Sequence, residues 1–539
     1  MSEIACDVLV VGSGMSAVHA AQTLVEAGRD VTMVDAGSPD ARHSVEVPER
    51  DFLWLRENDA DQHRYFLGRG FEGVPWGPAA NTLTPSRAYI ASGTERWSPL
   101  RSATFHGLES LAYGGLGNGW GAGCAAYPDV ELSEMGLDAP GIRVAYRVIA
   151  DRIGVAARHD DATPVCSEGL GERQEPLRLD ASIARIEAEY AKHRGALRRR
   201  GLVVGKDPMA VLTAPGGERG ATSYTDMEFW TDHAKAVYRP WMTLDALRAG
   251  PHFRYEGGLH VMTVAESEHR VHVTARPMAG GEDVRFAARR VVLAAGALGT
   301  ARIVLRSRLA DGTLPLLSNA YAVSACLHLR MLGRTLERER TSLGQLEMFH
   351  DPRGNGLGTR MVSLYTYRSL LLFKLVKEAP LAMADALPIL RALSPALILA
   401  THNHPDHAAP GKHCRLVPDA ESATGDALEV AWSPAPGEVE QNAASEKAIA
   451  WGLGRLGAPV IRTQHMPPGS TVHYAGTLPF AEGAVVRGRL DPAGRLGGTE
   501  RVFVADGSGF RYLPANGHTF TLMANAHRVA TAIAAEPGA

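Results

Sequence analysis

Cysteine is scarce in this sequence, with five residues in 539, an odd number spread widely along the chain. So few, widely separated cysteines argue against a disulfide framework and favour a reducing compartment. The N-terminus also lacks the basic and then apolar pattern of a secretory signal, because its first apolar run reads as a buried strand. We therefore expect a cytoplasmic protein.

A strong net charge and long apolar runs are missing as well. The formal net charge is −3, too small for a surface that attracts polyanions, so we expect no nucleic acid partner. The most apolar stretch, Tyr367 to Ala400, is interrupted by charged residues and three prolines, whereas a membrane-spanning helix needs roughly 20 apolar residues in a row. We expect no transmembrane segment and, in this stretch, two short amphipathic helices. Such helices usually belong to the core, but they could also form a lid over an apolar pocket or contact a membrane surface.

The chain is too long for one compact core, and its hydrophobic content of 45% is typical of globular proteins, so two or more domains are expected. Ser38 to Trp97 is rich in charge, proline and aromatic residues and shows no sustained helical or strand period, so we expect an irregular segment there and no separate domain. Ala181 to Arg200 predicts a charged amphipathic helix with a solvated face, Leu428 to Trp432 a strand, and Glu438 to Leu456 another helix.

The stretch from Asp7 to Gly37 has the pattern of a strand, a glycine turn, a helix and a second strand. Asp7 to Val11 is a continuous apolar run, as in strands buried on both faces of a parallel sheet. Met15 to Ala27 has apolar residues at helical spacing, and the second strand, Val31 to Val34, ends at Asp35. This order is typical of a dinucleotide-binding unit.

Each special residue of this unit has a physical task. Gly12 allows the tight turn, Gly14 lets the backbone approach a pyrophosphate, and Ala17 permits close packing of helix on strand. The N-terminus of the helix offers free N–H groups to phosphate. Asp35, about twenty residues beyond the turn, can accept hydrogen bonds from ribose hydroxyls. An ordinary βαβ unit without a ligand is the alternative, and the complete pattern disfavours it.

Later segments continue the same architecture. Arg289 to Leu309 reads as a buried strand, a glycine turn and a helix that can join the same sheet, and Arg501 to Ser508 is a third buried strand ending at an acidic turn. Phe253 to Ala275 alternates like a β-meander. The nucleotide domain is therefore expected to be assembled from segments that are far apart in sequence.

A glycine-rich stretch, Gly114 to Gly123, contains six glycines in ten residues and cannot be a stable helix or strand. Such a stretch usually lies against something flat. Trp120 and the small residues that follow it suggest burial, although a flexible surface loop is the alternative.

Two histidines flank the third strand: His473 precedes it and His518 follows it. Strand ends are where ligands bind in open α/β sheets, and imidazoles can transfer protons at neutral pH. An isolated histidine is more often a satisfied structural residue, but this arrangement favours a catalytic pair.

Over nearly its whole length the chain resembles the glucose–methanol–choline (GMC) family of FAD-dependent oxidoreductases; the middle, Ala310 to Pro467, matches only in outline. The segments that carry the resemblance are the glycine turn with Asp35, the loop Gly114 to Trp120, Val291 to Ser307, His473 to Thr477, and Val504 to Thr521.

The resemblance implies oxidation of an alcohol: a histidine takes the hydroxyl proton while the carbon hydride passes to flavin N5. His473 occupies the place of that histidine, and His518 matches the second member of the pair, with nearby Asn516 as the weaker candidate. The chemistry itself has the same requirements: an alkoxide must develop beside the hydride acceptor, while a base removes the hydroxyl proton and a donor holds the oxygen. The cofactor-contact residues implied together by the glycine turn and the family are Gly12, Gly14, Met15, Ala17, Asp35, Gly115, Asn118, Gly119, Val261, Ala295, Asp506, Gly507, His518 and Thr521.

Two departures from the family bear on the site. Some members bind FAD covalently through a histidine in the glycine-rich loop, and here Gly119 stands at that position, so we expect non-covalent FAD. After His473 to Thr477 the family commonly has an arginine-methionine-glycine run, whereas this chain has Leu478, Pro479 and Phe480. This second departure puts the substrate pocket in doubt and leaves the flavin fold untouched.

The expected fold is an α/β Rossmann-like FAD-binding domain, discontinuous in sequence, beside an α+β substrate domain built on an antiparallel sheet with helices. We assign 1–150, 220–309 and 468–539 to the FAD-binding domain, and 151–219 and 310–467 to the substrate domain. The expected substrate is a small-molecule alcohol, sugar-like or a secondary metabolite, and the electron acceptor is oxygen or another molecule. A flavoprotein of the same fold that does not oxidise alcohols is the alternative within the class.

A zinc hydrolase is the alternative from another class. Thr401 to His407 reads THNHPDH and resembles the HxHxDH motif of metallo-β-lactamase-like hydrolases. His402, His404, Asp406 and His407 are all capable ligands. The resemblance covers about a dozen residues and lacks the surroundings of that fold, so we expect no metal site.

Overall fold

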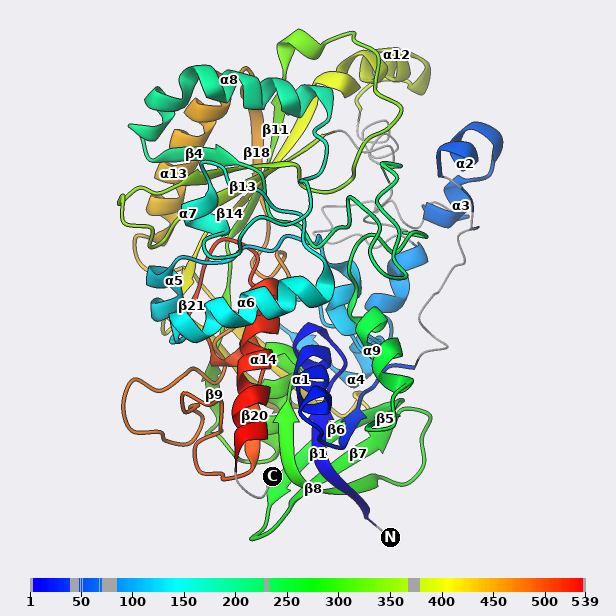
Figure 1. Ribbon diagram of the computed structural model, residues 1–539, viewed down its shortest axis with the longest axis vertical. Helices are drawn as coiled ribbons and strands as arrows, with labels where there is room; N and C mark the ends of the chain where they lie inside the picture. Colours follow the sequence, from blue (N-terminus) through cyan, green and yellow to red (C-terminus); the bar gives the residue numbers. More distant parts are fainter. Residues whose placement is uncertain are drawn as a thin grey trace.

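The computed structural model describes residues 3–38, 48, 50, 52–66, 68–69, 85–226, 232–366 and 379–536. Two large sheets lie towards opposite ends of the molecule's long axis, with helix α6 between them (Figure 1). Both chain termini lie at the end that carries the seven-stranded sheet (Figure 1).

The seven-stranded sheet confirms the predicted Rossmann-like core. Strands β1, β2, β5 and β8 run parallel to one another, and β20 pairs in parallel with the C-terminal part of β8. β7 pairs antiparallel with the N-terminal part of β8 and with β6. The strands are β5 (Phe253–Glu256), β2 (Val31–Val34), β1 (Ile4–Val11), β8 (Val284–Leu293), β7 (Val271–Pro277), β6 (Leu259–Glu266) and β20 (Val502–Val504).

The sheet corrects one sequence expectation. Phe253 to Ala275 is not a simple meander, because β5 leaves its neighbour β6 and pairs with β2 at the far edge of the sheet. The predicted sharing of one sheet by Asp7–Gly37 and Arg289–Leu309 is confirmed by the pairing of β1 with β8.

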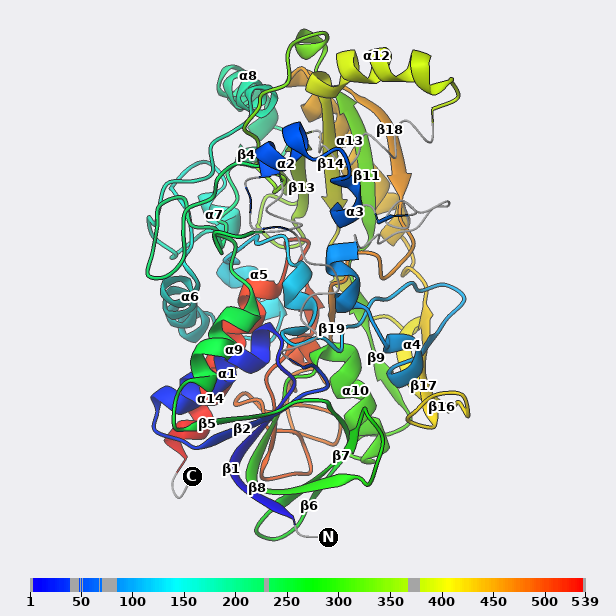
Figure 2. The same ribbon diagram turned by 90° about the vertical axis from the view of Figure 1, so that its right-hand side faces the viewer.

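The continuous apolar sequence of β1 is explained by two cores. Val8 and Val10 pack into the cluster under helices α1 (Met15–Glu26) and α14 (Thr519–Ala535), while Leu9 and Val11 pack into the opposite cluster with α10 (Gly296–Arg306). Figure 2 shows α1 and α14 on one side of this sheet and α10 on the other. Burial of both faces therefore makes the strand apolar at every position.

The second large sheet has six strands and is antiparallel throughout, as expected for the substrate domain. Its outer face packs against α8 (Ala181–Arg198) and α13 (Glu438–Arg455), which contribute Ile183, Ile186, Ile449 and Leu453 to one core. The strands are β18 (Val460–His465), β11 (Tyr321–Leu327), β14 (Leu397–Asn403), β13 (Arg360–Thr366), β12 (Leu346–His350) and β4 (Leu202–Gly205). The division of the chain at the predicted domain boundaries stays a prediction.

Shorter strands connect the loops around these sheets. A four-stranded sheet contains β3 (Leu100–Arg101), β17 (Asp426–Trp432), β16 (Lys412–Pro418) and β9 (Thr313–Pro315). Two further pairs are β10 (Leu317–Ser318) with β19 (Tyr474–Ala475), and β15 (Asp406–His407) with β21 (Tyr512–Leu513). The remaining helices and 3-10 helices are α2 (Phe52–Asn58), α3 (His63–Phe66), η2 (Pro85–Ile90), α4 (Thr94–Trp97), η3 (Gly115–Gly119), α5 (Asp129–Glu134), α6 (Ala139–Ile153), α7 (Thr163–Cys166), α9 (Pro240–Arg248), η4 (Leu329–Met331), α12 (Met383–Leu393), η5 (Ser394–Ala396) and η6 (Gly507–Gly509).

The structure describes the apolar stretch Tyr367 to Ala400 only in part. Residues 367–378 lie outside the described residues, α12 is one helix, and Leu397 to Ala400 belong to strand β14. α12 is not core, because Met383 is 65% exposed and Ile389 49% exposed. The helix meets the protein along a narrow strip centred on the buried Ala386.

Two predictions of irregular backbone were also incomplete. The glycine-rich loop forms the 3-10 helix η3, and the described parts of Ser38 to Trp97 contain short helices. The helices at Ala181 to Arg200 and Glu438 to Leu456 and the strand at Leu428 to Trp432 are confirmed. All five cysteines are buried and unpaired, and none of the described helices is long and apolar enough to span a membrane.

Candidate active site

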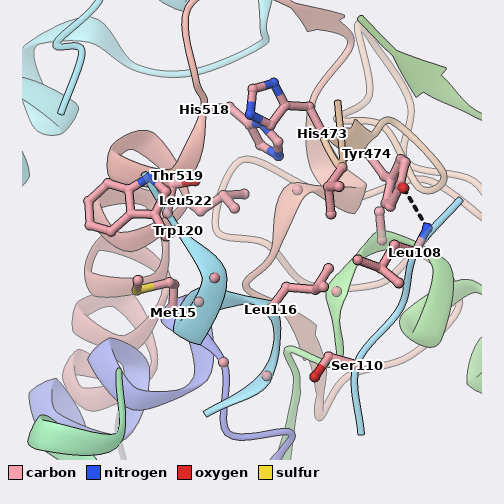
Figure 3. A pocket seen from close by; sticks show the side chains of 18 of the residues that line it. Met15, Leu108, Ser110, Leu116, Trp120, His473, Tyr474, His518, Thr519 and Leu522 are labelled. Carbon is pink, nitrogen blue, oxygen red and sulfur yellow. Dashed lines mark hydrogen bonds between the residues drawn. The ribbon is translucent and has the colours of Figure 1, made fainter. Parts of the chain in front are cut away.

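A cavity of about 720 Å³ lies between the two large sheets and receives side chains from both. Its lining brings together the glycine turn, the glycine-rich loop, the turn after β8 and the segments that carry His473 and His518. Figure 3 shows part of this lining, including Met15, Trp120, His473 and His518. The predicted residues among the lining are Gly12, Gly14, Met15, Asp35, Gly115, Gly119, Val261, Ala295, Asp506, Gly507, His473 and His518.

The glycine turn has the geometry that its sequence predicted. Gly12 has φ +99°, and a Cβ there would lie 2.7 Å from the carbonyl oxygen of Ala294, so only glycine fits. A Cβ on Gly14 would meet nothing within 4 Å, which leaves its backbone open to the cavity at the N-terminus of α1. A Cβ on Gly115 would lie 3.4 Å from the Cα of Gly14, so the two glycine segments form one wall.

Asp35 stands at the end of β2, where the sequence placed it. Its Oδ2 accepts hydrogen bonds from the Ser13 hydroxyl at 2.7 Å, the Tyr255 hydroxyl at 2.9 Å and the Gly37 N–H at 3.0 Å. Burial raises the pKa of Asp35, and these hydrogen bonds oppose the rise. These bonds hold the carboxyl group of Asp35 in the cavity wall, beside the glycine turn.

Asp506 supports the opposite wall. Its Oδ2 accepts from the Thr300 hydroxyl at 2.6 Å and its Oδ1 from the Ser508 N–H at 3.0 Å. These bonds hold the turn after β20 against α10, and burial raises the pKa of Asp506. The open glycine backbone, the helix N-terminus and the acidic residue at the end of β2 suit a dinucleotide such as FAD.

Three predicted cofactor residues do not line the cavity. Ala17 is fully buried in α1, where it packs under the sheet. The Asn118 amide donates to the Tyr113 carbonyl at 2.8 Å, and the Thr521 hydroxyl is 2.6 Å from the Tyr146 hydroxyl. These residues hold the cavity wall from behind.

The two predicted histidines lie together. Their ring centroids are 5.1 Å apart and the ring planes are nearly perpendicular, at 87° (Figure 3). His473 precedes β19 and His518 precedes α14, so the pair is built from segments on both sides of β20. Asn516 does not line the cavity, and its carbonyl accepts from the Tyr127 hydroxyl at 2.6 Å.

Both imidazoles are neutral at neutral pH. Burial lowers the pKa of His473 to about 4. Burial and the neighbouring His473 lower the pKa of His518 well below 6.5, although a hydrogen bond with the Tyr474 backbone opposes this effect. A neutral imidazole has one nitrogen free to accept a proton, which a base requires.

Asn319 determines which nitrogen of His473 is free. Its Oδ1 lies 3.1 Å from His473 Nδ1, while its amide donates to the carbonyls of His404 and Pro514 at 2.8 and 3.0 Å. Because the amide points at two carbonyls, Oδ1 faces the imidazole and accepts from Nδ1–H. Nε2 is then the acceptor, and it lies 3.8 Å from the position of a Cβ on Gly517.

The proposed metal-binding motif has a different role. Among the described residues no three histidine, cysteine, aspartate or glutamate side chains form a potential metal site. His402 Nε2 bonds the Ser324 hydroxyl at 2.8 Å, and His404 Nε2 lies 3.0 Å from Glu446. Asp406 accepts from the Ser318 N–H at 2.8 Å and pairs with the buried Lys412. The His407 ring contacts the Tyr512 ring, with centroids 4.6 Å apart, so the four side chains point to separate partners.

The family departure at Leu478 to Phe480 does not alter the cavity wall. Leu478 and Phe480 are buried, and none of the three residues lines the cavity. Their segment is fixed to η6: the N–H groups of Leu478 and Phe480 donate to the carbonyls of Ser508 and Gly509, each at 2.8 Å.

Sequence reasoning missed the polar residues of the substrate side. Asn319, Asp207 and Glu347 were not singled out, although all three contribute to the cavity or to its histidine. A sequence signal existed for Glu347, which is the one acidic residue of the strand Leu346–His350. No local signal marked Asn319, because its partner is 154 residues away.

Comparison with known proteins places the fold. No protein-family model and no curated protein sequence matches the chain. Two variants of formate oxidase from Aspergillus oryzae RIB40, an enzyme studied for modification of its FAD, superpose with TM-scores of 0.61 and 0.60 at 12% identity. Each alignment covers 100% of this chain and 99% of the other.

Pyridoxine 4-oxidase from Mesorbium loti superposes with a TM-score of 0.52 at 15% identity, over 98% of this chain and 99% of the other. At identities this low the superpositions establish the fold alone, and the activity has to be argued from the site itself. The predicted architecture is confirmed, and the chain has the same fold as formate oxidase and pyridoxine 4-oxidase.

Proposed function

We propose that the chain is an FAD-dependent oxidoreductase that oxidises the CH–OH group of a small-molecule alcohol, with His473 as the base. The observation that carries the proposal is the pair of neutral histidines facing the cavity that also contains the glycine turn. FAD, when bound, supplies the hydride acceptor. The formate oxidase neighbours, whose FAD is named, support flavin chemistry for this fold.

The protein's own residues supply proton transfer and orientation. Nε2 of His473 accepts the hydroxyl proton, because Asn319 holds the proton of the ring on Nδ1. The burial that lowers the pKa of His473 keeps this base free at neutral pH. His518, whose ring lies at right angles to that of His473, orients the substrate beside the base.

The ADP half of FAD is assigned to the glycine turn, with Asp35 on the ribose. Non-covalent binding is proposed because Gly119 offers no side chain for a bond to the flavin. Denaturing the protein and separating it from free flavin tests this point: yellow polypeptide refutes it. In the proposed reaction, oxygen or another electron acceptor reoxidises the flavin. We also propose that the protein is cytoplasmic.

The central experiment is anaerobic mixing of the flavin-loaded protein with a panel of alcohols, followed by flavin absorbance. At least one alcohol should bleach the flavin. His473→Ala should slow bleaching by about 10²- to 10⁴-fold while FAD stays bound, since a general base contributes that much. His269→Ala, at a side chain that is 81% exposed, is the matched control and should keep the parental rate.

Two results would redirect the proposal. Unchanged flavin reduction in His473→Ala would remove the assigned base. A protein that bleaches with no alcohol but turns over another substrate class would favour the alternative flavoprotein, which uses the same fold without oxidising alcohols.

A further inference from the structure

We propose that Asp207 and Glu347 bind a protonated amine of the substrate, so that the preferred substrate is an amino alcohol. The inference rests on the proposed function and names its substrate class. It begins from a pair of carboxyl groups in the substrate half of the cavity that the catalytic steps above do not use.

The sheet geometry places these carboxyl groups at the cavity. In the six-stranded sheet, even-numbered residues such as Met348, Val362 and Ala400 face the core under α8 and α13. The alternating odd-numbered residues face the cavity, because neighbouring side chains of a strand point to opposite faces. The odd-numbered lining residues are Tyr321, Val323, Glu347, Met361, Ser363, Tyr365, Leu399, Thr401 and Asn403.

The register gathers polar side chains into one row. Glu347 pairs with Ser363, and Ser363 pairs with Thr401 on the next strand. Glu347 also pairs with Gly205, the last residue of β4, and Asp207 follows two residues later. A Cβ on Gly123 would lie 2.7 Å from Asp207 Oδ2, so this carboxyl group lies against the glycine-rich loop.

Glu347 has an unfilled hydrogen-bonding position. The residue is 2% exposed, and its Oε1 accepts from the Ser363 hydroxyl at 2.6 Å. Its Oε2 is buried and has no hydrogen-bond partner among the described residues. A buried carboxylate oxygen without a donor is costly, so a ligand that brings an N–H group to it gains the missing bond.

Acidic groups surround Asp207 and Glu347, and the described cavity wall supplies no basic side chain to pair with them. Burial and repulsion between the two carboxylates raise the pKa of Asp207 well above its ordinary value, and Asp160 adds to the repulsion. Burial also raises the pKa of Glu347, to about 7. Among the described lining residues the only lysine or arginine is Arg302, which donates to the Ser98 carbonyl and to Glu109, at 2.9 and 2.7 Å. The pair therefore has no cation from the described wall.

An organic cation satisfies this site better than a neutral hydroxyl. Charge-assisted hydrogen bonds are roughly twice as strong as neutral ones, and the low-dielectric cavity strengthens the attraction. Tyr321 and Tyr365 add aromatic rings to the same face, and aromatic faces attract ammonium groups. The open Oε2 needs a hydrogen donor, which a primary amine carries and a quaternary ammonium lacks.

The same cavity places the two ends of an amino alcohol. Asn403 directly precedes His404, whose carbonyl accepts from Asn319, the partner of the catalytic histidine. The polar row runs from Asn403 through Thr401 and Ser363 to Glu347. An amino alcohol can therefore place its hydroxyl at His473, near one end of the row, and its ammonium group at Glu347, at the other end.

Calorimetric titration of the flavin-loaded protein with butylammonium chloride, and with neutral butanamide, tests binding without turnover. Butylammonium should bind at least about tenfold more tightly than butanamide, as expected for charge-assisted bonds in a dry site. Glu347→Gln and Asp207→Asn should each weaken butylammonium at least about tenfold and leave butanamide unchanged. Glu440→Gln, at an exposed carboxylate on α13, should bind like the parent.

The two substitutions protect the test against a folding failure, since either one alone decides it, and retained FAD absorbance shows a folded protein. Equal binding of butylammonium and butanamide to the parent overturns the inference, as does parental binding of butylammonium in either folded variant. If 4-aminobutan-1-ol and 1-pentanol bleach the flavin equally well, the proposed function stands and this inference fails. If butylammonium binds as expected while no alcohol bleaches the flavin, the proposed function fails instead.

Discussion

The contact between Asn319 and His473 makes the mechanism sensitive to one substitution, Asn319→Asp. The change keeps an acceptor 3.1 Å from Nδ1 but places a negative charge there. Two unit charges about 4 Å apart attract by roughly 4 kcal/mol at an effective dielectric constant of about 20, which corresponds to about 3 pH units. Part of this is lost, because Asn319 is 1% exposed and a carboxylate there loses the amide's bonds to two carbonyls.

A rise in the pKa of His473 of about 1 to 2 units is therefore expected in this variant. The parent's pKa is about 4, so the variant's would be about 5 to 6. The sign follows from the role of the base: flavin reduction needs neutral His473, and the neutral fraction falls as pH drops through the pKa. The acid limb of the rate profile should move upward by the same amount, while rates above pH 7 stay within a few-fold of the parent.

Anaerobic stopped-flow absorbance with saturating alcohol, from about pH 4.5 to 8, measures the shift. Asn319→Leu is the companion variant, since it removes the acceptor at similar volume. It should slow flavin reduction by about 10- to 100-fold across the range, without an upward shift of the acid limb, because a lost orienting hydrogen bond costs about 1 to 3 kcal/mol. Superimposable profiles for Asn319→Asp and the parent would refute the contact as the determinant of the tautomer.

Three further predictions concern stability and cofactor binding. Gly12→Ala should lose FAD and lower the melting temperature, because a Cβ at φ +99° would lie 2.7 Å from the Ala294 oxygen. A variant that keeps both its FAD absorbance and the parent's melting temperature contradicts the tight turn. Lys412→Met should cost about 3 to 5 kcal/mol of unfolding free energy near pH 8, by leaving Asp406 buried and unpaired. The pKa of Asp406 is already raised to about 6 and rises further without the lysine, so protonation should restore stability below that pH; an equal loss at pH 5.5 and pH 8 argues against this account. Glu347→Gln should raise the unfolding free energy by about 1 kcal/mol or more at pH 8 and little near pH 4. Burial raises the pKa of Glu347 from 4.5 to about 7, so its destabilising effect grows as pH rises from the unfolded to the folded pKa. Denaturant titration at both pH values measures the difference, and an unchanged or lower stability at pH 8 contradicts it.

The cofactor half of the fold was accessible from sequence because its determinants are local. In β1, burial on both faces requires an apolar side chain at every position, and the turn that follows requires glycine at a positive φ. These constraints act within a few residues, so they appear as a pattern that can be recognised. The pairing of β5 with β2 was not recognisable, since the choice between strand neighbours depends on the whole sheet.

The substrate half was less accessible for a related reason. Glu347 is the one acidic residue of its strand, and its proposed role depends on Ser363 and Asp207, which other segments bring next to it. Helix α12 was misjudged in the opposite way. Core packing was the default among the three roles that its apolar sequence left open, but Met383 and Ile389 are exposed among the described residues. A lid over an apolar pocket and a membrane-surface contact stay predictions.

In the proposed mechanism, the segment THNHPDH helps to orient the base, although its four candidate ligands do not form one metal site among the described residues. Its spacing suggested four ligands around one ion, but alternation along β14 sends His402 to the outer face, where it bonds Ser324. The backbone carbonyl of His404 instead accepts from the Asn319 amide, and the Asp406 carboxylate holds the Ser318 N–H beside it. The motif thereby fixes the orientation of Asn319, and through it the nitrogen of His473 that is free to take a proton. Loss of activity in a variant of this segment would therefore report a misplaced base, with no zinc lost.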